Sequence, residues 1–288
     1  MDGTLIAFAS QDGLRLAARD FPGPAGAGVV LCLHGLTRNS RDFTELARAL
    51  QGEHRILAPD QRGRGASAYD PQPANYNLPV QVGDVWTLLD QLGVERCVIV
   101  GTSMGALMSI LMANARPERI AGLVLNDAGP EVDPRGLARI GAYVGKGGPV
   151  TSWDEAVAGL RAVHGASYPT YAPEDWARMA RAIYAETPEG RLRPAYDPAL
   201  AQAFAADNGV TPDMWPAFEV LRTIPGLVLR GAISDILPAE TAAEMGRRFA
   251  GTEVVTVEGR GHAPDLAEPG AVAAIRAFLR REDVNARW

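Results

Sequence analysis

The chain has 288 residues, 47% of them hydrophobic, which is enough for one large domain or two small ones around a buried core. A formal net charge of −6 and a single lysine, Lys146, argue against nucleic acid as a partner. The chain has no basic start followed by an apolar segment and no window of about 18 apolar residues, so we expect a cytoplasmic protein with no membrane partner. No feature of the sequence indicates an oligomeric state.

The first part of the chain alternates short apolar runs with helical periodicities. Residues 4–9 and 14–19 flank the turn sequence Gln11-Asp12-Gly13, which predicts a β-hairpin at an antiparallel edge. Further strands are predicted at 29–33, 55–58, 96–100 and 120–125, and helices at 43–50, 80–92 and 104–115. This alternation indicates a mostly parallel, doubly wound sheet with helices on both faces. Cys32 and Cys97 lie in or beside these strands, so we expect both to be reduced core residues.

The alternation stops between residues 130 and 224. This stretch is rich in aromatic residues, contains no convincing strand, and is predicted to form helical pieces over 153–163, 173–186 and 198–207. A long structureless excursion would be improbable in a compact domain, so we interpret it as a helical cap inserted after the sixth strand. We expect substrate contacts from three tryptophans of the cap, Trp153, Trp176 and Trp215, and from His34 of the core.

The strand and helix alternation then resumes. Strands are predicted at 227–230 and 253–257, and helices at 239–249 and 270–280. The sheet would then have about eight strands. Residues 1–129 and 225–288 would form the core domain, and residues 130–224 the cap.

The sequence Gly101-Thr102-Ser103-Met104-Gly105 lies between a predicted strand and a predicted helix, which places Ser103 at a sharp turn. The glycines have a steric reason, because the backbone on either side of such a turn is too close for side chains. A serine hydroxyl is a poor nucleophile at neutral pH, so it needs a base, an acid that orients the base, and donors for an oxyanion.

An acid and a histidine each follow a late strand, at the edge of the sheet where Ser103 lies. Asp235 follows the strand at 227–230, and His262 follows the strand at 253–257. We therefore predict that Ser103 attacks a carbonyl carbon, that His262 takes and returns the proton, and that Asp235 orients His262. Asp127, which follows the strand at 120–125, is the alternative to Asp235.

The chain resembles the α/β-hydrolase superfamily, and in particular its capped esterase and lactonase-like branch. The residues that carry the resemblance are His34-Gly35, Asp60-Gln61-Arg62-Gly63-Arg64-Gly65-Ala66-Ser67, Gly101-Thr102-Ser103-Met104-Gly105 and Gly261-His262. One oxyanion donor is expected to be the backbone N–H of Met104, and the resemblance places the other at Leu36. We expect no cofactor, and no spacing of His, Cys or Asp fits a metal site.

These residues predict a serine hydrolase that cleaves a carboxylic ester of a small or medium substrate through an acyl-enzyme. The resemblance includes lactonases and carbon–carbon bond hydrolases with the same triad, which remain alternatives. An alternative of another class is a receptor-like, ligand-binding module with little turnover. A substrate that carries a carboxylate is a further hypothesis, because the cap contains arginines that could bind it, such as Arg161, Arg178, Arg181, Arg191 and Arg193.

Overall fold

A computed structural model describes residues 3–206 and 213–288 of the chain. Eight strands form one sheet in the order β1-β2-β4-β3-β5-β6-β9-β10. β1 pairs with β2 and β2 with β4 in antiparallel fashion, and all other neighbours are parallel, so the predicted sheet is confirmed. The strands are β1 (Thr4–Ala9), β2 (Arg15–Phe21), β3 (Val29–Leu33), β4 (Arg55–Asp60), β5 (Cys97–Thr102), β6 (Ile120–Asn126), β9 (Gly226–Gly231) and β10 (Thr252–Val257).

The central strands are continuous apolar runs because helices cover both faces of the sheet. Every residue of β6 is buried, and Cys32 and Cys97 are buried and free in neighbouring strands. One face packs against α2 (Leu78–Gln91), α3 (Met104–Ala115) and α9 (Ala239–Arg248). The other face packs against α1 (Thr44–Ala49), α10 (Pro269–Leu279) and α11 (Glu282–Asn285). Short 3₁₀ helices lie at η1 (Ser40–Phe43), η2 (Pro73–Asn75), η3 (Pro117–Arg119), η4 (Gly165–Ser167) and η5 (Glu219–Arg222).

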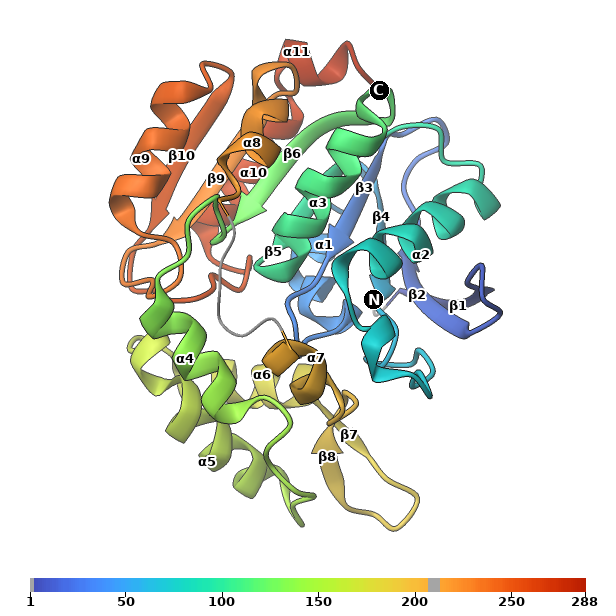
Figure 1. Ribbon diagram of the computed structural model, residues 1–288, viewed down its shortest axis with the longest axis vertical. Coiled ribbons are helices and arrows are strands. Elements are labelled where there is room, and N and C mark those ends of the chain that lie inside the picture. Colours follow the sequence, from blue (N-terminus) through green and yellow to red (C-terminus); the bar gives the residue numbers. More distant parts are fainter. Residues whose placement is uncertain (1–2, 207–212) are drawn as a thin grey trace.

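The segment between β6 and β9 lies mainly beyond the carboxyl ends of the strands, below the sheet in Figure 1. It contains α4 (Pro134–Tyr143), α5 (Trp153–His164), α6 (Pro173–Ile183), β7 (Tyr184–Glu186), β8 (Leu192–Pro194), α7 (Leu200–Ala206) and α8 (Trp215–Phe218). Residues 213–224 differ from the rest of the segment, because Phe218, Leu221 and Ile224 pack into the core beside α3. The division of the chain at residues 130 and 224 remains a prediction.

The predictions for this segment were wrong in two places. Helix α4 was not expected, and β7 and β8 form an antiparallel hairpin where no strand was expected. The helix predicted over 173–186 ends at Ile183, because Pro188 and Gly190 form a turn in which Thr187 N–H donates to Arg191 O over 2.7 Å. Of the helix predicted over 198–207, Leu200–Ala206 is helical, and Asp207 is outside the described residues. None of the described helices is both long and apolar enough to cross a membrane.

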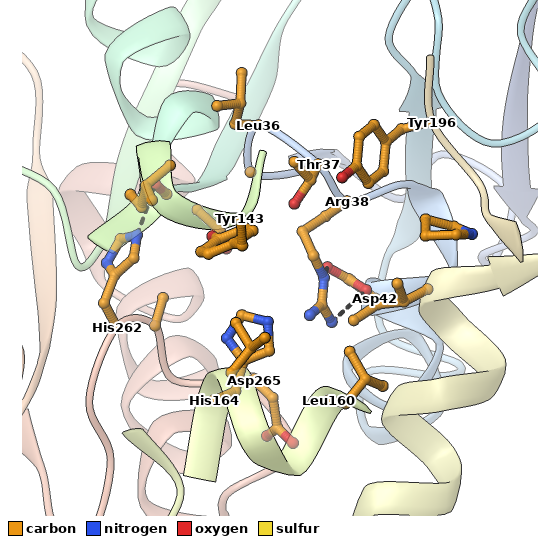
Figure 2. Close-up of a pocket in the computed structure, with 18 of the residues that line it drawn as sticks. Leu36, Thr37, Arg38, Asp42, Tyr143, Leu160, His164, Tyr196, His262 and Asp265 are labelled. Atoms are coloured by element: carbon orange, nitrogen blue, oxygen red, sulfur yellow. Dashed lines mark hydrogen bonds and ion pairs between the residues drawn. The ribbon is translucent and has the colours of Figure 1, made fainter. Parts of the chain in front are cut away.

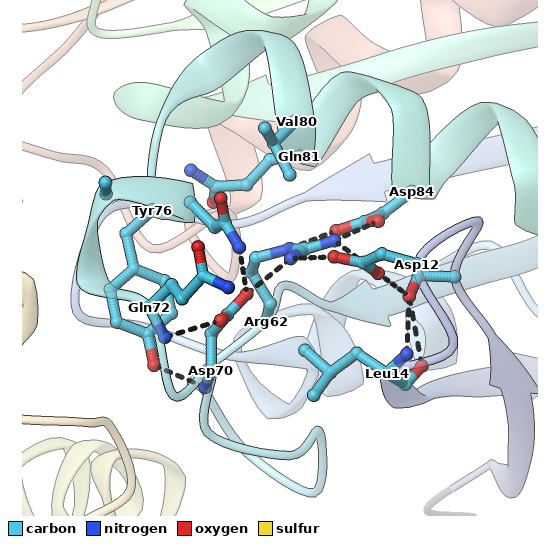
Figure 3. Close-up of polar contacts among 12 residues, drawn as sticks. Asp12, Leu14, Arg62, Asp70, Gln72, Tyr76, Val80, Gln81 and Asp84 are labelled. Atoms are coloured by element: carbon cyan, nitrogen blue, oxygen red, sulfur yellow. Dashed lines mark hydrogen bonds and ion pairs between the residues drawn. The ribbon is translucent and has the colours of Figure 1, made fainter.

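A buried arginine joins three separate segments of the core (Figure 3). Arg62, which is 1% exposed, donates two hydrogen bonds of 2.7 Å to Asp84 of α2. It also donates to Asp70 over 2.5 Å and to Asp12 of the β1–β2 turn over 3.0 Å. The hydrogen bond from Arg62 is the largest influence on Asp12 and holds the pKa of its carboxyl at about 2. This cluster fixes the loop after β4 against the hairpin and α2.

We expect Arg62→Met to lower the free energy of unfolding by about 3–5 kcal/mol, because it leaves two buried carboxylates without their cation. The measurement is urea denaturation followed by circular dichroism. Arg135→Met is the matched control, since Arg135 lies at the surface and pairs only with Asp133 among the described residues. Equal losses in the two variants would show that the cluster does not stabilise the fold.

Candidate active site

Ser103 lies between β5 and α3 in a backbone conformation that only a tight turn imposes. Its φ is 54° and its ψ is −117°. A Cβ on Gly101 would lie 2.4 Å from Gly105 O, and a Cβ on Gly105 would lie 2.0 Å from Leu33 O. Both distances are too short for any residue other than glycine, so the predicted steric reason for the two glycines is the one the structure shows.

Three side chains form a continuous hydrogen-bonded line at the carboxyl edge of the sheet. His262 Nε2 lies 2.8 Å from Ser103 Oγ, and His262 Nδ1 lies 2.8 Å from Asp127 Oδ2. Asp127 is completely buried, and the imidazole is 9% exposed. With Nδ1 donating to the carboxylate, Nε2 can accept the serine proton.

The predicted acid, Asp235, is not in this line. Its carboxylate instead pairs with Arg139 of α4, which donates from Nε over 2.5 Å and from Nη2 over 2.8 Å. Burial opposes the charge on Asp235, but the ion pair with Arg139 outweighs it and lowers the pKa of Asp235. The prediction that Asp235 orients His262 was therefore wrong, and the alternative, Asp127, takes that position.

The loop after β9 still contributes to the site through the residue before Asp235. Ser234 Oγ donates to Asp127 Oδ2 over 2.6 Å, and Gly231 N–H donates to Asp127 Oδ1 over 2.9 Å. β6 and β9 are neighbours in the sheet, so both loops lie beside His262. Sequence spacing cannot separate two acids at the ends of adjacent strands. The feature that could have favoured Asp127 is its position directly after β6, which is fully buried.

Of the expected oxyanion donors, Met104 directly follows Ser103, and Leu36 lines the same cavity as Ser103. Met104 is the first residue of α3, where backbone N–H groups have no intrahelical acceptor, and Leu36 lies on the loop after β3. Behind both residues lies Arg64, which is fully buried and donates from Nε to Leu36 O over 2.9 Å. Its Nη2 lies 3.6 Å from Met104 Sδ. Burial lowers the pKa of Arg64, whose hydrogen-bond acceptors are backbone carbonyls and a thioether sulfur among the described residues.

A cavity of about 370 Å³ lies between this edge of the sheet and the inserted segment (Figure 2). The core contributes Leu36, Arg38, Ser103 and His262 to its lining. The inserted segment contributes apolar and aromatic side chains: Ile140, Tyr143, Leu160, Val163, Tyr168, Ile183, Tyr184 and Tyr196. A volume of this size fits a small or medium organic molecule.

His164 of α5 also lines the cavity. It lies edge-on to Tyr143, with ring centroids 5.3 Å apart. Burial, followed by the charges of Arg38 and Arg139, lowers the pKa of His164 to about 3. The imidazole is therefore neutral at ordinary pH.

The tryptophans expected to contact substrate do not line the cavity. Trp176 packs within the inserted segment, edge-on to the stacked rings of Tyr168 and Tyr171, and the guanidinium of Arg181 lies over the ring of Trp153. Trp215 is farther away still. Its Nε1 donates to Glu131 over 2.7 Å, and the guanidinium of Arg248 lies 3.9 Å from its ring centroid.

His34 does not reach the cavity either. It is completely buried, and its Nε2 accepts a hydrogen bond of 3.0 Å from Gln61 N–H. Trp153 and Trp176 belong to the apolar core of the inserted segment itself, and Trp215 packs against the core of the sheet. The sequence pattern could not separate the core of the segment from the face it turns to the cavity.

The five arginines considered for a substrate carboxylate also lie outside the cavity lining. Arg178, for example, pairs with Asp175 and Asp265, and Arg191 donates to Pro149 O. Within residues 3–206 and 213–288, no three His, Cys, Asp or Glu side chains are grouped so that they could hold a metal ion.

Comparison with known proteins agrees with this fold. The model of the alpha/beta hydrolase family matches residues 30–275. The chain belongs to the α/β-hydrolase family. A crystal structure of an alpha/beta hydrolase from Novosphingobium aromaticivorans is similar, with a TM-score of 0.92 and 46% identity, covering 96% of this chain and 98% of that one.

Two curated relatives have named activities. A 3-hydroxybutyrate-oligomer hydrolase from Cupriavidus necator is 36% identical, covering 92% of each chain. A 2-(acetamidomethylene)succinate hydrolase from Mesorhizobium japonicum is 29% identical, covering 88% of this chain and 89% of the relative. Hydrolase chemistry is thus common to the named relatives, whereas their substrates differ.

The two acids can be distinguished by parallel substitutions. We expect Asp127→Asn to lower the rate of hydrolysis by about 10⁴, because an amide at this position favours the wrong tautomer of His262. Asp235→Asn should cause a much smaller loss, because it removes only the ion pair with Arg139. The measurement is steady-state hydrolysis of 4-nitrophenyl butyrate by both variants. The opposite ranking would move the orienting role to Asp235.

Proposed function

We propose that the protein is a serine hydrolase that cleaves a carboxylic ester of a small or medium substrate through an acyl-enzyme. The observation that carries the proposal is the line of two 2.8 Å contacts from Asp127 through His262 to Ser103. An aligned base within hydrogen-bond distance of a serine hydroxyl is what activates that hydroxyl as a nucleophile.

The first half of the reaction forms the acyl-enzyme. Ser103 Oγ attacks the ester carbonyl carbon while its proton moves to His262 Nε2, and Asp127 stabilises the imidazolium that results. The carbonyl oxygen becomes an oxyanion and accepts hydrogen bonds from the N–H groups of Leu36 and Met104. The bond between carbonyl carbon and alcohol oxygen then breaks, and the alcohol leaves with the proton from His262.

The second half releases the acid. Water gives a proton to His262 Nε2 and attacks the acyl carbon, which again forms an oxyanion between the two N–H groups. The intermediate then breaks its bond to Ser103 Oγ, which takes the proton back from His262. Arg64 supports both halves, since its positive charge lies directly behind the two residues that bind the oxyanion.

Two further observations favour an ester as the bond cleaved. The cavity next to Ser103 is lined mainly by apolar and aromatic side chains and is large enough for a short acyl chain and a short alcohol. The full-length relative from Cupriavidus necator is named for a hydroxy acid oligomer, whose units are joined by ester bonds.

The nucleophile and base are tested together. We expect Ser103→Ala and His262→Ala each to lower kcat by about 10⁴ to 10⁶, and the double variant to be little slower than either, because the members of a triad act as one unit. The measurement is hydrolysis of 4-nitrophenyl acetate and butyrate. Ser109→Ala is the matched control, because Ser109 lies on α3, the helix that follows Ser103, and its hydroxyl bonds only to Gly105 O among the described residues.

Three outcomes would contradict the proposal. Losses that multiply in the double variant would show that Ser103 and His262 do not share a step. Full activity in Ser103→Ala would require a different nucleophile. The absence of turnover with every acyl ester tested would favour a ligand-binding module over an enzyme.

A further inference from the structure

The cavity lining contains one cationic side chain of the core that the proposed reaction does not use. Arg38 lies two residues after Leu36, and its guanidinium extends into the cavity near Tyr143 and His164 (Figure 2). Gly35 lies between Arg38 and Ser103. A Cβ on Gly35 would lie 3.6 Å from both Arg38 Cγ and Ser103 Cβ. A group bound by Arg38 would therefore belong to the molecule that reacts at Ser103.

Asp42 holds the guanidinium of Arg38 in place and accepts hydrogen bonds from only two of its N–H groups. Arg38 donates from Nε to Asp42 Oδ2 over 2.7 Å and from Nη2 to Asp42 Oδ1 over 2.8 Å. Among the described residues no other acceptor bonds to this guanidinium, so three of its five N–H groups are free for a ligand. Asp42 thus fixes the plane of the guanidinium without occupying all of its donors.

The remaining charges of the lining also favour an anion. Lys146, the only lysine of the chain, lines the cavity and has no ion-pair partner within the described parts of the chain. Two carboxylates line the cavity, and each is paired, Asp42 with Arg38 and Asp265 with Arg178. His164 is neutral, because burial and its neighbouring charges keep its pKa near 3. With both carboxylates neutralised by their ion pairs, Lys146 is a cation of the lining that pairs with no carboxylate of the described residues.

We propose that Arg38 binds a free carboxylate of the ester substrate, with Lys146 as a second cation of the same subsite. The preferred substrates are then esters of small molecules that carry a carboxylate besides the ester bond. This inference rests on the proposed ester hydrolysis. It assigns anion recognition to a core loop next to the oxyanion donors rather than to the cap arginines, and a planar guanidinium suits a carboxylate because it can donate two parallel hydrogen bonds.

The first test measures binding without turnover, in the Ser103→Ala protein. The probes are two matched pairs in which a carboxamide replaces the carboxylate: 3-acetoxybutanoate with 3-acetoxybutanamide, and monomethyl glutarate with its amide. The first pair places the carboxylate on the alcohol half and the second on the acyl half. Isothermal titration calorimetry should show tighter binding of the acid by about 10- to 100-fold in at least one pair.

The variants locate the source of that preference. Arg38→Met together with Asp42→Asn removes both charges of the ion pair, so no unpaired carboxylate is left in the cavity, and should bring the acid-to-amide preference close to one. Lys146→Met changes an exposed residue and should reduce the preference by a few-fold. Arg161→Met is the matched control. It removes an arginine of α5 that lies outside the cavity lining, and should leave the preference unchanged.

The outcomes separate this inference from the proposed function. Equal affinities for acid and amide in both pairs, no measurable binding of either acid, or a preference that survives the Arg38 and Asp42 double substitution would overturn carboxylate binding by Arg38. The otherwise unmodified enzyme is then tested with the two amide esters and 4-nitrophenyl butyrate. Failure to hydrolyse any ester would overturn the proposed function, while the calorimetry would still decide whether Arg38 binds a carboxylate.

Discussion

The buried carboxylate of Asp127 organises the active edge of the sheet. A completely buried charge is costly unless hydrogen-bond donors surround it, and Asp127 accepts from Gly231 N–H, Ser234 Oγ and His262 Nδ1. These donors come from the loops after β9 and β10, while Asp127 itself follows β6. Through His262 the same network reaches Ser103 after β5. One desolvated charge therefore fixes four loops relative to one another.

The inserted segment is fastened to that network and not merely laid over it. Tyr168 donates from its hydroxyl to Ala263 O over 2.7 Å, and Gly261 N–H donates to Ser167 O over 2.6 Å. Both contacts flank His262. The Arg139–Asp235 ion pair makes a third connection, from α4 to the loop after β9. The residue that the sequence favoured as the catalytic acid thus has a structural task at the boundary between core and insertion.

Charge around the reacting atoms comes from the core loops. Arg64 contacts Leu36 and Met104, the expected oxyanion donors, and Arg38 lines the same cavity as Ser103. Both arginines lie on loops of the core. Arginines of the inserted segment form ion pairs and stacking contacts elsewhere, as Arg178 does with Asp265. The core thus places a buried cation against Leu36 and Met104, and the inserted segment supplies mainly apolar and aromatic surface to the cavity.

The sequence by itself determined the sheet, the sharp turn at Ser103 and two members of the hydrogen-bonded line, Ser103 and His262. Continuous apolar runs require burial on both faces, and the glycines at 101 and 105 allow the close backbone approach of a tight turn, so Ser103 and His262 could be located from local pattern. Tertiary structure alone decided between Asp127 and Asp235, because both follow adjacent strands and only the direction of each side chain separates them. It also decided which side chains of the insertion face the cavity. That choice depends on how helices α4 to α6 pack against one another and against the core, which hydrophobic periodicity in a single helix does not specify.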